Sequence, residues 1–302
     1  MTDARALRLT AEAEASHLPH FLARAEQLAG TVLLGEHGRR RAGMGDDFWQ
    51  YRLVQTGDSR RMIDWRRSAR SDAEFVRERE WQVAKSVMLW VDASASMQFK
   101  SADALPKKFD RARLIALTAS ILLIKGGERV GLSGTDLPPQ RGRAQILRLA
   151  EHFTHNTDTD TDTDTDTDTD TEYGAPEARA MLPHARALFV SDFMGDVEAV
   201  KAALAKAADR GVRGVLMQVL DPAEESFPFH GRTIFESAGR SLRYETLKAN
   251  DLKARYLDKL AQRKEELRHL CSVTGWQFAT HHTDATAQTA LLWLHRALER
   301  PV

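Results

Sequence analysis

Four oxygen-bearing side chains stand where this sequence could bind a metal ion. Asp92, Ser94 and Ser96 alternate in the segment Asp-Ala-Ser-Ala-Ser, which directly follows the unbroken apolar run 86–91. Asp192 ends a second apolar run further along the chain. Carboxylate and hydroxyl oxygens are the ligands that Mg²⁺ and similar hard cations prefer. The spacing therefore predicts a site for Mg²⁺ or Mn²⁺, and the alternative is that Asp92 and Ser94 only cap the following turn.

The two aspartates follow segments that read as strands buried on both faces, because each segment is a continuous apolar run. Helical patterns alternate with these runs, which is typical of a parallel sheet covered by helices on both faces. Ligands of such sheets bind at the carboxyl ends of the strands, where we expect Asp92 and Asp192 to converge. The predicted strands are Ser86–Val91, Arg129–Ser133, Ala187–Ser191, Gly214–Leu220 and Gln277–Thr280. The predicted helices are Lys107–Ile124, Ala144–Phe153, Val197–Ala208, Lys253–Ser272 and Ala287–Leu298.

The chain is expected to have two parts. Residues 1–84 are predicted to form a helix over the first thirty residues and a module of short strands rich in Arg, Gly and aromatic residues. Residues 85–302 are predicted to form the α/β domain, with a hairpin (Phe229–Tyr244) inside an excursion at about 223–249. The arginines and acids of the module are interspersed, which favours internal Arg–carboxylate pairs over a phosphate-binding track. We therefore predict a scaffold without a nucleic-acid partner, with partner docking as the alternative, and expect Asp64 to be a buried, paired charge.

One segment interrupts the α/β pattern. Residues 157–170 are seven consecutive Thr-Asp repeats. A polar, like-charged run has no apolar face to bury, so we predict a disordered loop at about residues 154–173. The whole chain has 43 Lys+Arg and 43 Asp+Glu, and without the seven repeat aspartates the balance is 43 against 36 (43 − 7). Cation collection by the repeats is the weaker alternative, because flexible carboxylates offer no preformed cage.

The apolar segments and the cysteine content predict a cytoplasmic protein with no membrane segment. The longest predominantly apolar run, 114–124, has eleven residues including Thr118 and Ser120, which is short of the ~20 that a membrane helix needs. The first residues show no apolar signal core. The single cysteine, Cys271, forms no internal disulfide, which fits a reducing compartment.

Several spaced motifs, taken together, resemble those of the bacterial family called DUF58. They are Gly43-x-Gly45, Phe48-x-x-Tyr51-Arg52, Gly57-Asp58, Ile63-Asp64-Trp65, Ser68-Ala69-Arg70, the Asp92 loop, Ser191-Asp192-Phe193 and Asp221-Pro222-x-Glu224. The resemblance runs from about Arg39 to the C-terminus. It implies a von Willebrand factor A-like, Rossmann-like domain with a parallel-rich sheet, preceded by the Arg-rich module. Many relatives carry two N-terminal membrane helices, and this sequence shows none.

The resemblance also implies a metal-ion-dependent adhesion site. Asp92, Ser94 and Ser96 match its first loop, and Asp192 matches its later strand end. Thr171 is the nearest candidate for the Thr of the family, although the repeats make its alignment arbitrary. In such sites a carboxylate of the partner completes the metal shell. The function implied is a non-enzymatic, metal-assisted adaptor that links a MoxR-type AAA+ ATPase to client proteins.

The same residues support an enzymatic function less well than they support a binding function. A metal-dependent hydrolase or phosphatase using Asp92 and Asp192 is the alternative, but Ser94 stands where a dehalogenase-type phosphatase needs a second acid. No phosphate-binding motif G-x-x-x-x-G-K-[ST] occurs, so ATP hydrolysis would come from a partner. His281 and His282 are adjacent on a predicted strand and should point to opposite faces, which disfavours a shared metal. We therefore predict no catalytic residue.

Overall fold

The structure is a computed structural model, and its parts are described as two units. The described residues are 25–26, 29, 42–43, 47–55, 58–60, 63–70, 73–80, 86–155, 171–178, 181–239 and 242–299. One compact unit is Gly35–Ala84, and the other combines Met1–Leu34 with Lys85–Val302. This division differs from the expected grouping of residues 1–84, since Ala25 and Ala29 are buried in the core of the larger unit. The rest of the helix expected in the first thirty residues, apart from Glu26, lies outside the described residues.

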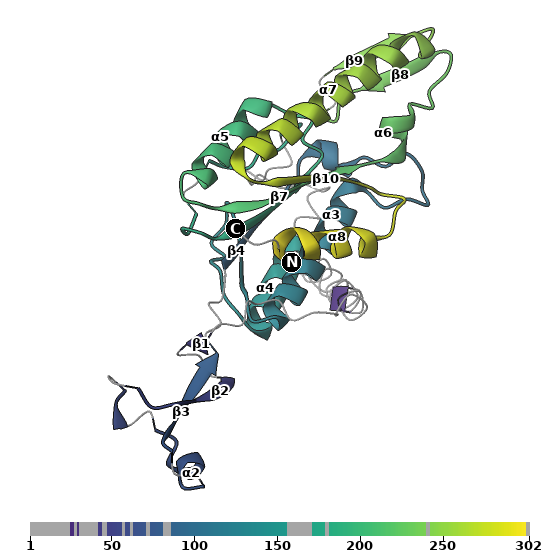
Figure 1. Ribbon diagram of the computed structural model, residues 1–302. Helices are drawn as coiled ribbons and strands as arrows, with labels where there is room; N and C mark the ends of the chain where they lie inside the picture. The colour runs from purple at the N-terminus through teal and green to yellow at the C-terminus, as the bar shows by residue number, and fades with distance from the viewer. Residues whose placement is uncertain are drawn as a thin grey trace, which may run out of the picture. The chain divides into compact units, whose positions relative to one another are not determined.

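A five-stranded parallel sheet forms the centre of the larger unit (Figure 1). Its strands are β4 (Ser86–Val91), β5 (Arg129–Leu132), β6 (Arg186–Ser191), β7 (Arg213–Leu220) and β10 (Gln277–His282). Their spatial order is β5-β4-β6-β7-β10, and every neighbouring pair is parallel. This is the order of a doubly wound α/β sheet. The predicted α/β class is therefore confirmed, and each predicted strand agrees with an observed one to within two residues.

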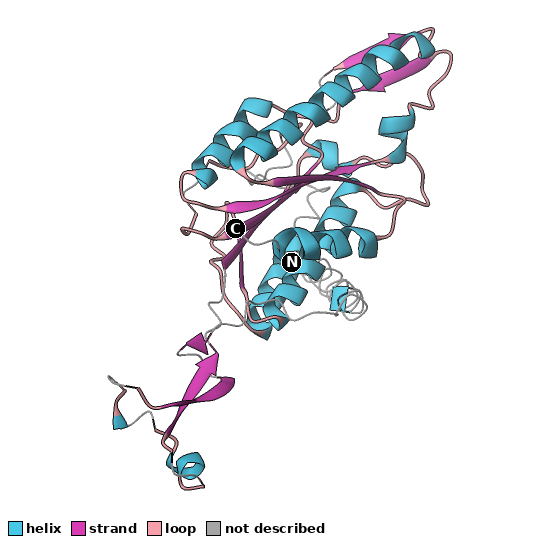
Figure 2. Cartoon of the chain, in the orientation of Figure 1, coloured by secondary structure: helices cyan, strands magenta, loops and turns pink. Residues whose placement is uncertain are grey.

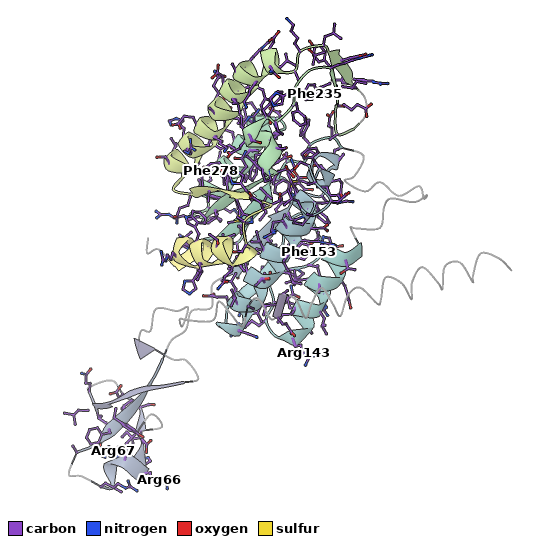
Figure 3. The ribbon with its side chains drawn as sticks, turned by 90° about the vertical axis from the view of Figure 1, so that its right-hand side faces the viewer. Arg66, Arg67, Arg143, Phe153, Phe235 and Phe278 are labelled. Atoms are coloured by element: carbon purple, nitrogen blue, oxygen red, sulfur yellow. The ribbon has the colours of Figure 1, made fainter. Side chains whose placement is uncertain are left out.

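Helices cover both faces of the sheet (Figure 2). One layer contains α3 (Lys108–Lys125), α4 (Arg143–His155) and α8 (Ala287–Glu299), and the other contains α5 (Val197–Ala208) and α7 (Asn250–Thr274). Successive residues of β6 alternate between the two cores: Leu188 packs in the first and Phe189 in the second. Figure 3 shows the same separation in Phe153, which belongs to the first core, and Phe278, which packs against the second. The apolar run of β6 is thus explained by burial on both faces.

The loop after β5 folds back along the outer side of this edge strand. Val130 and Gln140 exchange backbone hydrogen bonds, with N···O distances of 3.0 and 3.1 Å. The side-chain amide of Gln145, on α4, also donates to the carbonyl of Val130 at 2.8 Å. Gly131 has no room for a side chain, because a Cβ there would lie 2.6 Å from the backbone nitrogen of Pro139. The loop therefore covers the open side of β5 closely.

A hairpin stands between α6 (Pro222–Ser226) and α7, where one was expected. Its strands β8 (Thr233–Glu236) and β9 (Arg243–Thr246) pair antiparallel. Its base is held by aromatic contacts of Phe227, which lies 5.2 Å from Tyr256 of α7 and 5.8 Å from Phe235 of β8, measured between ring centroids. The hairpin and the first turns of α7 are thus joined by an aromatic cluster.

The smaller unit contains a three-stranded antiparallel sheet and one short helix. The strands β1 (Ala42–Gly43), β2 (Asp47–Leu53) and β3 (Phe75–Glu80) have the order β1-β3-β2. Helix α2 (Trp65–Ser68) begins at Asp64, whose carboxylate accepts a hydrogen bond from the Arg67 amide at 3.0 Å. The expectation of a buried charge is wrong here, because Asp64 is half-buried and Trp65 is 56% exposed. Asp64 acts as a helix N-cap.

The Thr-Asp repeats lie outside the described residues. Helix α4 ends at His155, and the described chain resumes at Thr171. The prediction of a disordered loop across residues 157–170 therefore stays a prediction.

Candidate functional site at the carboxyl edge of the sheet

The parallel pairing of β4 with β6 brings Asp92 and Asp192 to one edge of the sheet. Val91 lies opposite Val190 in the register, and each aspartate follows shortly after its strand end. The backbone amide of Asp92 donates to the carbonyl of Val190 at 2.9 Å. Both aspartates are buried. The two carboxylates therefore lie at the edge where the sequence placed them.

Both carboxylate oxygens of Asp92 accept hydrogen bonds from protein donors. The amide of Ser94 donates to Oδ1 at 2.9 Å, and the hydroxyl of Ser191 donates to Oδ2 at 2.6 Å. Burial raises the pKa of Asp92, the two serines oppose that rise, and the charge of Asp192 adds to it. Ser94 also lies next to Ser96, with their hydroxyl oxygens 3.3 Å apart, at the start of the 3₁₀ helix η2 (Ala95–Gln98).

The segment 171–174 lies directly on this loop. The amide of Ala95 donates to the carbonyl of Thr171 at 3.2 Å, and the amide of Ser96 donates to the carbonyl of Glu172 at 3.0 Å. Gly174 packs against Asp92, because a Cβ at this position would lie 2.7 Å from the carboxyl carbon of Asp92. The backbone carbonyl of Thr171, the nearest candidate for the Thr of the family, thus contacts the loop.

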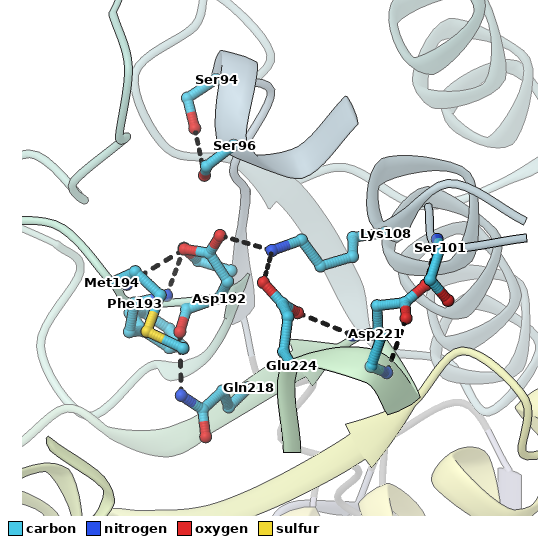
Figure 4. Close-up of polar contacts among 12 residues, drawn as sticks. Ser94, Ser96, Ser101, Lys108, Asp192, Phe193, Met194, Gln218, Asp221 and Glu224 are labelled. Atoms are coloured by element: carbon cyan, nitrogen blue, oxygen red, sulfur yellow. Dashed lines mark hydrogen bonds and ion pairs between the residues drawn. The ribbon is translucent and has the colours of Figure 1, made fainter. Parts of the chain in front are cut away.

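Asp192 forms a buried ion pair with Lys108, the first residue of α3 (Figure 4). The ammonium of Lys108 lies 2.8 Å from Oδ2 of Asp192 and 2.7 Å from Oε1 of Glu224. The other oxygen of Asp192 accepts the amide of Met194 at 3.0 Å. Burial alone would lower the pKa of Lys108, but the carboxylates of Asp192 and Glu224 outweigh it and raise that pKa. The lysine therefore carries its charge inside the protein.

Glu224 is held in place by a capping box at the start of α6. The carboxylate of Asp221 accepts the amide of Ala223 at 2.8 Å, and Glu224 Oε2 accepts the amide of Asp221 at 2.7 Å. The second oxygen of Asp221 accepts the amide of Ser101 at 2.9 Å, which ties the loop after η2 to α6. Glu224 thus uses one oxygen for its helix and the other for Lys108.

Sequence reasoning missed Lys108 and the ionic role of Glu224. A signal for Glu224 was present, because Asp221-Pro222-x-Glu224 is a capping-box pattern with Pro at the first helical position. Lys108 had no such signal, since a lysine in the first turn of a helix usually points into water.

The five expected metal ligands lie near one another, but their contacts do not fit a divalent ion. The carboxylate oxygens of Asp92 and Asp192 all accept hydrogen bonds from protein donors, and one of the two donors to Asp192 is the cation of Lys108. Within the described ranges, no group of three or more His, Cys, Asp or Glu side chains is arranged to hold a metal. His281 and His282 do not converge either: His282 Nε2 lies 2.7 Å from Glu225, whereas His281 is buried and its Nε2 has no hydrogen-bond partner in the described part of the chain.

The fold and the site define a class: an α/β unit with a doubly wound parallel sheet, an Asp-x-Ser-x-Ser loop and a lysine-bridged carboxylate pair at the strand ends. The chain belongs to the family described as "Protein of unknown function DUF58", which matches residues 50–266.

Two mycobacterial relatives show the same level of similarity to this chain. They are the uncharacterized proteins Rv1480 of Mycobacterium tuberculosis (strain H37Rv) and Mb1516 of Mycobacterium bovis, each 28% identical over 214 residues. The match covers 68% of this chain and 65% of each relative. The chain thus matches less than two thirds of the length of these relatives.

Three solved structures that show similarity to this chain come from Bacteroides and Vibrio. An aerotolerance-related membrane protein of Bacteroides fragilis is 14% identical, with a TM-score of 0.41 over 71% of this chain and 98% of its own. BatB of Bacteroides thetaiotaomicron is 13% identical, with a TM-score of 0.36 over 70% and 98%. A membrane-spanning protein of Vibrio fischeri is 13% identical, with a TM-score of 0.17 over 72% and 98%.

The expected cytoplasmic location is corrected at this point. Two of these solved proteins, from Bacteroides fragilis and Vibrio fischeri, are described as membrane proteins, which contradicts the expectation. The expectation rested on the length of apolar runs and on a single cysteine, and neither feature fixes where a protein is located. In the described part of the chain, no helix has the length and apolar character needed to cross a membrane.

Proposed function

We propose that this chain is a non-enzymatic protein-binding adaptor whose docking surface is the carboxyl edge of the parallel sheet. The proposal rests on one observation: the carboxylates at this edge already have hydrogen-bond partners inside the protein. Asp92, Asp192 and Glu224 each give their carboxylate oxygens to internal donors. Acid–base or nucleophilic catalysis needs a group free to exchange a proton or to attack. The hydrolase alternative, which would use Asp92 and Asp192, therefore gains no support from these contacts.

Two exposed aromatic side chains at this edge support a docking role. Phe99, which follows η2, is 40% exposed, and its ring centroid lies 5.9 Å from the ammonium of Lys108. Tyr173, in the segment 171–174, is 43% exposed. Aromatic residues on a rigid, polar-rimmed surface are common anchors of protein interfaces. The internal polar network would hold these two anchors in a fixed position.

The proposed partner is a AAA+ ATPase of the MoxR type, with client proteins as further partners. This part of the proposal comes from the resemblance to DUF58 proteins. It agrees with the sequence in one respect, since no phosphate-binding motif of the P-loop type occurs, and nucleotide hydrolysis would then be supplied by the partner. Metal assistance is left out of the proposal because the contacts of Asp92 and Asp192 do not fit it.

Binding to a purified MoxR-type ATPase from the same genome tests the proposal. We expect Tyr173→Ala and Phe99→Ala to weaken binding, measured by biolayer interferometry, by about tenfold or more, as for aromatic anchors at other interfaces. The control is Val273→Ala: Val273 is 72% exposed but lies at the end of α7 that precedes the amino end of β10. Equal binding by all variants, or phosphatase turnover that Asp92→Asn abolishes, would contradict an adaptor acting through this edge.

A further inference from the structure

Lys108 is an unusual residue to find inside a protein. It is 1% exposed, and lysines are almost never fully buried unless they are paired. Its position is fixed from both ends, because its backbone amide donates to the carbonyl of Phe99 at 3.2 Å and its ammonium contacts Asp192 and Glu224. These carboxylates come from two different segments, the end of β6 and helix α6. The ammonium therefore joins α3, β6 and α6 at the strand edge.

The ammonium lies where a divalent ion bound to Asp192 would need to bind. Oδ2 of Asp192 faces the ammonium at 2.8 Å, and Oδ1 faces the amide of Met194 at 3.0 Å. A divalent ion on Oδ2 would have to displace the ammonium, and one on Oδ1 would have to displace the Met194 amide, so either would cost a hydrogen bond that the buried carboxylate now has.

We propose that Lys108 is the resident cation of this edge: its ammonium pairs with the carboxylates of both Asp192 and Glu224, so the edge keeps its structure without a divalent metal. Because this cation is a side chain of the protein, a chelator cannot remove it. The statement about structure is independent of the proposed function. Its extension, that partner binding at this edge is insensitive to EDTA, rests on the proposed function.

Calorimetric titration with Mn²⁺ or Mg²⁺, together with thermal melts, tests the proposal on the unmodified protein. We expect no saturable binding at millimolar metal and equal melting temperatures in EDTA and in excess metal, because a ligand that binds the folded state would raise the melting temperature. Saturable binding by wild type that Asp92→Asn or Asp192→Asn abolishes would overturn the proposal.

A pair of lysine variants gives the matched comparison. Lys108→Met removes the charge at similar size and leaves the buried carboxylate of Asp192 and the partly buried carboxylate of Glu224 without their cation, so we expect the melting temperature to fall by roughly 10 °C. Mn²⁺ should now bind and restore part of that loss. Lys107→Met is the control, because the ammonium of the neighbouring Lys107 donates to the side-chain oxygen of Gln98, at 3.2 Å, and not to a carboxylate of this edge. An unchanged melting temperature in Lys108→Met would contradict the proposal.

A third variant tests the proposal even if Lys108→Met does not fold. The triple variant Lys108→Met, Asp192→Asn, Glu224→Gln removes the cation and both of its partners, and it should fold and bind no Mn²⁺. A triple variant that binds Mn²⁺ as Lys108→Met is expected to do would contradict the assignment of Asp192 and Glu224. Loss of ATPase binding in every condition would count against the proposed function alone, since the metal titrations do not depend on the partner.

Discussion

At the scale of single residues, His281 shows how burial controls protonation near the strand edge. It lies in β10 and is 6% exposed, and among the residues that the structure describes Nε2 has no hydrogen-bond partner. Burial lowers the pKa of His281 to about 4, the positive charges of Arg111 and His282 act in the same direction, and Asp284 opposes them. Because the folded pKa lies below the unfolded value near 6.5, this residue stabilises the fold above pH 6.5, and its contribution is lost as the pH falls through 4.

We therefore expect acid to destabilise wild type more than His281→Gln. Between pH 6.5 and 4, the free energy of unfolding of wild type should fall by up to about 3 kcal/mol more than that of the variant. Urea unfolding at a series of pH values measures this difference. The control is His269→Gln, an exposed position on α7, and parallel pH profiles for wild type and His281→Gln would contradict the prediction.

Gly174 should be required for the packing of the 171–174 segment on Asp92. A Cβ at Gly174 would lie 2.7 Å from the carboxyl carbon of Asp92 and close to its oxygens. Gly174→Ala should therefore lower the free energy of unfolding by about 1–3 kcal/mol, as overpacking does elsewhere. Gly239→Ala is the matched control, because its Cβ would meet only Glu172, at an ordinary 3.5 Å. Equal urea midpoints for the two variants would contradict this packing.

At the scale of elements, the short helix α6 depends on its first residue. Asp221 is buried, and its carboxylate accepts the amides of Ala223 and Ser101. Asp221→Ala should cost about 3 kcal/mol, because it removes a helix cap and leaves the buried amide of Ala223 and the partly buried amide of Ser101 without their acceptor. Asp196→Ala, at the exposed N-cap of α5, should cost about 1 kcal/mol. Thermal or urea unfolding of both variants measures the difference, and equal costs would contradict it.

The strands and helices could be predicted from the sequence where their burial determined which amino acids they contain. The strands of the sheet are buried on both faces, so Ser86–Val91 and the other runs stood out without any alternation. The convergence of Asp92 and Asp192 followed, because parallel neighbouring strands end at one edge. Lys108 and Glu224 were not predictable as a pair, since they are 116 positions apart and only the folded chain brings their charges together.

At the scale of the whole molecule, the Thr-Asp repeats should be dispensable for folding. They contain no apolar side chain, and a change of loop length alters the closure free energy by only about 0.6 kcal/mol per doubling. Replacing residues 157–170 with a short Gly-Ser linker should leave the melting temperature nearly unchanged by calorimetry. A loss of cooperative unfolding would show that the repeats take part in the structure.

The segment folded against β5 has a consequence for self-association. An edge strand with unpaired backbone groups is a template on which a strand of another molecule can add, and such additions lead to aggregation. Here Val130 already has both of its outward backbone groups bonded to Gln140, and the approach of Pro139 to Gly131 leaves no room for a foreign strand. This side of the sheet is therefore protected against intermolecular β-pairing, which should keep concentrated protein free of amyloid-like contacts through β5.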